Sequence, residues 1–195
     1  MKYRLRFIAH SAAVLAAASI TALILSSIAA QANQRKFAYT YEATTAPKGS
    51  IEFENWVTWR YRDAKSGSSR VDRFDFRHEL EFGVTDRLQI GLYLADWTYN
   101  ERDPEKKARY QHSGIEVIYN LTNPTTDLIG SGLYGEVLVG DDVVELEGKI
   151  LLQKNFGPLM IAYNAVIEAE WEGEDLEERT GKFEQTLGIS YELNR

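Results

Sequence analysis

The sequence predicts an all-β protein, an antiparallel up-and-down transmembrane β-barrel of eight strands preceded by a signal-peptide helix. Three observations predict this fold class. Apolar and polar residues alternate over eight segments, each about as long as a tilted strand that crosses a bilayer. Turn-forming residues separate these segments. The mean hydropathy is negative although 44% of the residues are hydrophobic, a combination typical of strands with one apolar face.

The clearest strands form a hairpin from Val143 to Trp171. In its first arm, apolar residues such as Ile150 alternate with charged ones such as Lys149. The run Asn-Phe-Gly-Pro at 155–158 interrupts the pattern, and the alternation begins again at Leu159. Because successive side chains of a strand point to opposite faces, each arm is predicted to be a strand with one apolar and one polar face.

The first half of the chain contains three segments of the same kind. The segment 51–61 is followed by a loop that contains Ser-Gly-Ser-Ser, and the segment 71–84 turns at Thr85 into 88–99. The next stretch, 100–109, is charged and contains a proline, which predicts a loop.

Three further segments surround the hairpin. The segment 110–121 ends before Asn123-Pro124, a turn-forming pair. A glycine-rich strand is predicted at 128–140, and an acidic loop at 172–181 leads to the last strand, 182–193.

The connections differ in length, as in outer-membrane barrels, where short periplasmic turns alternate with long outer loops. Short turns are predicted at Thr85, Thr122 and Asn155, and longer charged loops at Arg62, Asn100 and Glu172. The connection at Gly140 is short where a long loop is expected. An even number of strands places both termini in the periplasm. The residues 33–50 before the first strand are predicted to pack against the barrel mouth.

Residues 1–32 have the features of a signal peptide. Lys2, Arg4 and Arg6 form a basic start, an apolar stretch follows, and Ala30-Gln31-Ala32 is a small-x-small cleavage site. We expect cleavage after Ala32, which leaves residues 33–195 as the outer-membrane β-barrel domain of a Gram-negative bacterium. An uncleaved N-terminal membrane helix is the alternative. The chain has no cysteine, which excludes a lipoprotein anchor, a disulfide and a thiolate metal site.

The charge balance is acidic. The leader holds three of the 22 basic residues and none of the 29 acidic ones, so the mature chain has a formal charge of −10. Nucleic acid is therefore not expected as a partner, since phosphate binding needs a basic surface.

The inward faces of the predicted strands carry most of the charge, and acidic residues outnumber basic ones. Rings of carboxylates favour cations in a water-filled lumen. An eight-strand barrel, however, has room inside only for its own side chains, so we expect a lumen plugged by ion pairs that include Arg60 and Arg77. The predicted lumen-lining residues are Glu52, Glu54, Arg60, Asp75, Arg77, Glu79, Glu81, Glu116, Glu136, Glu145, Glu147, Lys149, Glu168, Glu170, Lys182 and Glu184.

The leading interpretation is a small pore, a transport-type barrel or a structural envelope protein, without enzyme activity. A lipid-modifying enzyme in the barrel wall is one alternative, based on the pair His112-Ser113. Adjacent strand residues point to opposite faces, which argues against such a site. A soluble periplasmic barrel that binds an apolar ligand is the other alternative. No catalytic, cofactor-binding or metal-binding residue is predicted, and the solute is not identified.

Two motif sets carry a resemblance to a known kind of protein. One is Phe37-x-Tyr39-x-Tyr41-Glu42 with Pro47-x-Gly49-x-x-Glu52-x-Glu54; the other is Glu145-x-Glu147-x-Lys149, Gln153-Lys154, Asn164 and Glu168-x-Glu170. The chain resembles uncharacterised Gram-negative outer-membrane barrel proteins. It is distantly similar to transporter-type barrels encoded with aromatic-degradation pathways. Relatives of this type have further strands, so the resemblance implies a truncated member. The end of the chain, 186–193, also resembles the signal that barrel-insertion machinery recognises, which implies this machinery and outer-membrane lipid as partners.

Overall fold

The computed structural model describes residues 35–62, 71–100 and 108–193. The predicted signal peptide and most of two predicted loops lie outside these residues. The described part contains eight strands, and none of its segments is a helix that could cross a bilayer. The strands are β1 (Ile51–Arg62), β2 (Val71–Thr85), β3 (Leu88–Asn100), β4 (Ala108–Thr122), β5 (Gly130–Val139), β6 (Val143–Phe156), β7 (Leu159–Glu172) and β8 (Glu178–Tyr191).

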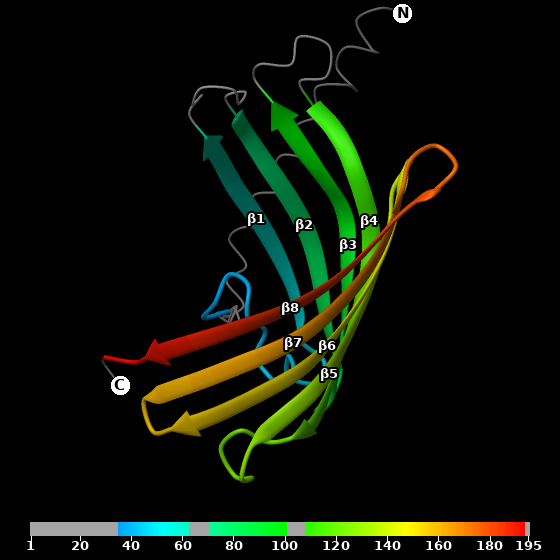
Figure 1. The fold of residues 1–195 in the computed structure, drawn as a ribbon. Helices are drawn as coiled ribbons and strands as arrows, with labels where there is room; N and C mark the ends of the chain where they lie inside the picture. Colours follow the sequence, from blue (N-terminus) through cyan, green and yellow to red (C-terminus); the bar gives the residue numbers. More distant parts are fainter. Residues whose placement is uncertain (1–34, 63–70, 101–107, 194–195) are drawn as a thin grey trace, which may run out of the picture. The chain divides into compact units, whose positions relative to one another are not determined.

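The eight strands form one antiparallel sheet in which each strand pairs with its neighbours in the chain (Figure 1). The sheet is curled into a half-barrel, with β1 and β8 as its edges. The prediction of eight antiparallel strands in an all-β protein is therefore confirmed. Closure of these strands into a barrel is not observed, because the described residues contain no pairing between β1 and β8.

Side chains of opposite character occupy the two faces of the sheet. Strand β5 shows this most regularly, since Tyr134 and Glu136 are buried on the concave side while Leu133 and Val137 are exposed on the convex side. The hairpin of β6 and β7 follows the same rule, with Asn164 buried and its neighbours on the other face more exposed. The alternation in the sequence thus corresponds to the two faces of a real sheet.

Residues 35–50, called here the lead-in, run along the concave face before β1 begins (Figure 1). Its residues Tyr41 and Ala43 pack on Ile118, Tyr134 and Leu151, which form the apolar core of the described chain. A closed eight-strand barrel has room inside only for side chains, whereas this concave face also holds a stretch of backbone. The sheet therefore curls less tightly than such a barrel requires.

Three predicted strand starts are corrected, and that of β4 moves from residue 110 to Ala108. Strand β8 begins at Glu178, four residues earlier than predicted, because it pairs with β7 as far as Glu172. The acidic loop predicted at 172–181 is therefore only the turn 173–177. Strand β5 begins at Gly130 rather than at residue 128, because Asn123 caps a turn by accepting hydrogen bonds from the next backbone N–H groups.

A bulge in β3 changes which side chains face inward. Glu79 of β2 pairs with Tyr93, and the preceding His78 pairs with Ala95, so Leu94 has no opposite residue. Tyr93 and Asp96 consequently both lie on the concave side, although strict alternation places them on opposite faces.

Candidate functional site in the concave face

A cavity of about 550 Å³ opens on the concave face, lined by residues of the lead-in and of all eight strands. Trp56, Tyr134 and Lys149 are among the lining residues, and they come from β1, β5 and β6. The curl of the sheet therefore gathers side chains that are far apart in the sequence. Ten of the sixteen predicted lumen residues line this cavity: Arg60, Asp75, Arg77, Glu79, Glu136, Glu145, Glu147, Lys149, Glu168 and Glu184.

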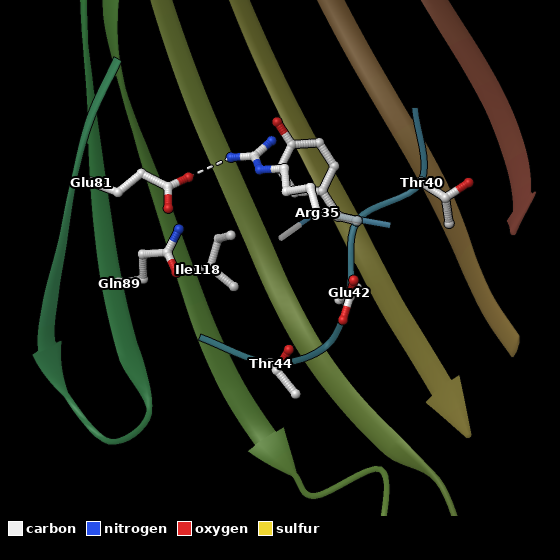
Figure 2. Close-up of a pocket in the computed structure, with 8 residues that line it drawn as sticks. Arg35, Thr40, Glu42, Thr44, Glu81, Gln89 and Ile118 are labelled. Carbon is white, nitrogen blue, oxygen red and sulfur yellow. Dashed lines mark hydrogen bonds and ion pairs between the residues drawn. The ribbon is translucent and has the colours of Figure 1, made fainter. Parts of the chain in front are cut away.

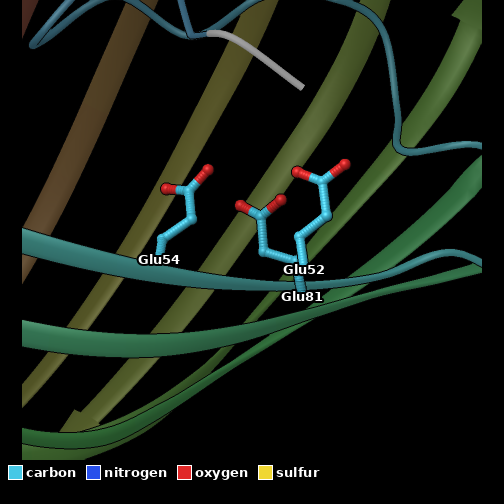
Figure 3. A group of neighbouring side chains, drawn as sticks. All are labelled: Glu52, Glu54 and Glu81. Atoms are coloured by element: carbon cyan, nitrogen blue, oxygen red, sulfur yellow. The ribbon is translucent and has the colours of Figure 1, made fainter. Parts of the chain in front are cut away.

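The other six predicted residues lie beside this cavity in two groups. Glu170 and Lys182 belong to a pairing at β7 and β8, in which the Lys182 ammonium contacts Glu168 at 2.6 Å and Glu170 at 3.4 Å. The remaining four are the acidic residues Glu52, Glu54, Glu81 and Glu116 of the first four strands. Figure 3 shows Glu52, Glu54 and Glu81 pointing to the same side of the sheet.

Arg35 of the lead-in is the cation nearest Glu54, Glu81 and Glu116, and Figure 2 shows its guanidinium paired with Glu81. Its Nη2 donates a hydrogen bond to Glu81 Oε1 at 2.5 Å, and its Nε lies 3.5 Å from Glu54 Oε2. The same Nη2 is 3.7 Å from Glu79 Oε2 and 3.8 Å from Glu116 Oε1. One guanidinium thus serves four carboxylates but makes a hydrogen bond to only one of them among the described residues. Part of the excess of negative charge predicted from the sequence lies here.

Aromatic rings complete the surroundings of the two cations nearest the lead-in. The Tyr41 ring lies below the Arg35 guanidinium at 4.7 Å and faces the Lys149 ammonium at 4.0 Å. Lys149 also lies 4.1 Å from the Tyr134 ring and 2.7 Å from a carboxylate oxygen of Glu147. Both cations are therefore held by a carboxylate together with an aromatic face.

The first two strands contribute the arginines expected to form ion pairs, and both do. Arg60 pairs with Asp75, which also accepts from Arg73. Arg77 Nε donates to Asp96 Oδ2 at 2.7 Å, and its guanidinium lies 4.1 Å from the Tyr93 ring.

Four amide side chains hold the backbone of the lead-in. Asn164 accepts from the Tyr41 N–H at 2.6 Å and donates to the Tyr41 carbonyl at 3.0 Å. The Ala43 N–H donates to Gln153 at 2.8 Å, and its carbonyl accepts from Asn120. Gln89 accepts from the Ala46 N–H at 2.7 Å. These amides come from β3, β4, β6 and β7, so they attach the lead-in across most of the sheet.

His112 and Ser113 point to opposite faces of β4. Ser113 Oγ donates to the Leu94 carbonyl, while the His112 ring lies on the cavity side, 3.5 Å from Asp96. Adjacent residues on opposite faces cannot act on one substrate. His78 faces outward and accepts a hydrogen bond from Trp97 at 3.1 Å.

Carboxylates approach one another closely at three places, each with ligand oxygens within 4.8 Å. Oxygen donors of this kind suit hard cations such as Ca²⁺ and Mg²⁺. The groups are Glu52, Glu54 and Glu81; Glu79, Glu81 and Glu116; and Glu145, Glu168 and Glu170. The second group alone is buried at all three residues.

Sequence reasoning missed two charged residues of this site. Arg35 precedes the first strand, so the alternation of strand residues gives no information about it. Asp96 is assigned to the outer face by strict alternation, and only the bulge at Leu94 turns it inward. The inward amides were a usable signal, because an amide among charged neighbours is suited to hold a backbone N–H or carbonyl.

Comparison with known proteins gives one result. A protein-family model matches residues 29–186, and it describes a family of unknown function, DUF6662. The chain belongs to this family. The DUF6662 match covers the lead-in, strands β1 to β7 and most of β8, so it includes every residue of the site described above. Searches of the curated proteins and of the solved structures returned no match.

Proposed function

We propose that this DUF6662 protein is an outer-membrane β-barrel protein, a small pore, a transport-type barrel or a structural envelope protein with an acidic interior. The proposal includes export by the leader and both termini on the periplasmic side. The ends of the strands support the termini part of this proposal. The first residue of β1, Ile51, and the last residue of β8, Tyr191, lie at the same end of the strands as the short turn 157–158.

The observation that carries the proposal is the apolar character of the convex face. Large apolar side chains are exposed there from the first strand to the last, among them Phe53, Val137, Ile150, Ile167 and Leu187. Monomeric soluble proteins rarely expose a continuous apolar patch larger than a few hundred Å². Lipid would cover such a face without cost, and alternation of lipid-facing apolar and inward polar residues is the pattern of membrane barrels.

The interior argues against a soluble barrel that binds an apolar ligand, since eight carboxylates, four arginines and Lys149 are among the residues that line the cavity. No arrangement of His112 and Ser113 favours a lipid-modifying enzyme. The lead-in supports a plugged interior, because its backbone lies where a water-filled lumen would be.

A matched pair of substitutions tests lipid contact. Ile150 lies in the middle of β6 and is 54% exposed, while Ile51 is the first residue of β1 and is 68% exposed. In liposomes, Ile150→Lys should lower the free energy of unfolding by about 2–4 kcal/mol, and Ile51→Lys by about 0–1 kcal/mol, because the cost depends on depth in the bilayer. The measurement is a urea unfolding curve, in which the folded fraction is detected by gel mobility of heated and unheated samples.

A soluble protein would respond differently. Both isoleucines would then be surface residues, and both substitutions would change the free energy of unfolding by about 0.5 kcal/mol or less. Equal effects of the two substitutions, together with recovery of the exported chain in the soluble periplasmic fraction, would refute the proposal.

A further inference from the structure

The acidic group of β1, β2 and β4 is not fully neutralised by Arg35 while its carboxylates are ionised. Glu54, Glu79, Glu81 and Glu116 carry four negative charges when ionised, against the single positive charge of Arg35. Glu79 is 1% exposed and Glu116 is fully buried. A buried carboxylate without a full counter-charge destabilises a fold while it is ionised. This group therefore favours either the uptake of protons or a further positive charge.

Three carboxylate oxygens of this group lack a hydrogen-bond donor among the described residues, and two of them lie 3.7 and 3.8 Å from Arg35 Nη2. Neither oxygen of Glu79 has a hydrogen-bond partner among the described residues, and neither has Glu116 Oε1. The other oxygen, Glu116 Oε2, accepts from the Tyr93 hydroxyl at 2.5 Å and from the Tyr41 hydroxyl at 3.4 Å. The two phenols thus fix the Glu116 carboxylate while its Oε1 stays available as a ligand, as outer hydrogen bonds do for metal-binding carboxylates.

Gly91 of β3 makes the approach of these carboxylates possible. A Cβ at this position would overlap Glu79 Oε1 and lie 2.5 Å from Glu116 Cγ. Every other residue type would therefore push the two carboxylates out of their present positions. The space beside Gly91 is occupied by the carboxylates of Glu79 and Glu116. The backbone of β3 therefore allows these two buried carboxylates to approach each other.

We propose that Glu79, Glu81 and Glu116 bind a calcium ion. Their oxygens lie within 4.8 Å of one another, which agrees with ligands around an ion that has bonds of about 2.3–2.6 Å. Mg²⁺ demands a near-ideal octahedron at about 2.0–2.1 Å and gives up its water reluctantly, so it should bind more weakly in this buried site. Arg35 Nη2 lies 3.7 Å from Glu79 Oε2 and 3.8 Å from Glu116 Oε1, so the ion would bind beside this guanidinium and supply the charge that Arg35 leaves unbalanced. The site does not depend on lipid around the convex face.

The test uses the full chain refolded in detergent and freed of metal with EDTA. Terbium, which emits when excited through nearby Tyr or Trp, should give a saturable signal that Ca²⁺ competes away. Glu79→Gln should weaken this binding by about tenfold or more, since it removes a ligand charge. The matched control is Glu168→Gln, in the acidic group of β6 and β7. This substitution should leave terbium binding at the proposed site unchanged.

Thermal unfolding in the same detergent gives a second readout. Ca²⁺ at about 1 mM should raise the Tm of the unmodified chain. In EDTA, Glu79→Gln should be at least as stable as the unmodified chain, because a buried charge is gone, and Ca²⁺ should not raise its Tm. The proposal is overturned if Ca²⁺ changes neither readout, or if Glu79→Gln keeps the full Ca²⁺ response. These outcomes say nothing about the liposome test of the two isoleucines, so the failures of the two proposals are distinguishable.

Discussion

The two arginine–aspartate ion pairs of the concave face differ in how strongly they are exposed to solvent. Asp96 is buried, and the Arg77 side chain that pairs with it is 30% exposed. Asp75 is half-buried, and its partner Arg60 is 58% exposed. Removing the cation of a buried pair leaves a buried carboxylate without a counter-charge, which lowers the stability strongly. In an exposed pair, water solvates the remaining charge, so the loss of stability is small.

We therefore predict different effects for two similar substitutions. Arg77→Ala should lower the free energy of unfolding by about 2–4 kcal/mol, because it leaves Asp96 buried without its guanidinium. Arg60→Ala should cost about 0–1 kcal/mol, since Arg73 still contacts Asp75 at 2.8 Å and the site is open to solvent. Urea unfolding in detergent measures both.

A double-substitution cycle serves as the control. Adding Asp96→Asn to Arg77→Ala should recover much of the lost stability, because the orphaned charge is then absent. If Arg77→Ala costs no more than Arg60→Ala, the Arg77 pair is not a buried ion pair in solution.

At the scale of elements, the lead-in is the segment that sets the interior apart from that of a simple barrel. Its backbone groups are satisfied by amides of four strands rather than by a ninth strand. Asn164 is fully buried and makes two of these bonds, both to Tyr41. Its loss would leave a buried N–H and a buried carbonyl without partners, which costs about 1–3 kcal/mol for each group.

Asn164→Ala is accordingly predicted to loosen the lead-in without unfolding the sheet. The lead-in contains Lys36 and Lys48, both exposed, so trypsin can cut there once the segment leaves the concave face. We expect trypsin to cleave Asn164→Ala faster than the unmodified chain after Lys36 and Lys48. Mass spectrometry of the fragments measures the cleavage rates. Asn55→Ala, which removes an exposed asparagine bound to His78, should cleave like the unmodified chain. Equal rates in all three chains would mean that the amides do not hold the lead-in.

Strand positions followed from the sequence because a period of two is a local property of each segment. The eight strands and their two faces needed no knowledge of the rest of the chain, and the hairpin of β6 and β7 has the predicted faces. The features that could not be predicted from the sequence depend on residues far apart in the chain or on irregular strand pairing. The position of Arg35 depends on carboxylates from three different strands, and the inward turn of Asp96 depends on one unpaired residue in β3.

Closure of the sheet is the whole-molecule property that local patterns do not determine. Alternation is the same in a closed barrel and in an open half-barrel, and the difference arises from what fills the concave side. Here the lead-in occupies part of that side, which favours a wider curl than eight strands alone can close. In a bilayer the backbone groups at the edges of β1 and β8 must find partners, because lipid offers none.

We predict that the lead-in determines whether the proposed barrel conducts ions. Twelve of the sixteen predicted lumen residues are acidic, so an open lumen should pass cations in preference to anions. In planar bilayers we expect no steady open level from the unmodified chain, because the lead-in lies across the concave face. A chain with both Asn164→Ala and Gln153→Ala should show cation-selective steps as the lead-in is released. Stable steps from the unmodified chain would contradict this prediction, since they would require a lumen wide enough to stay open beside the lead-in.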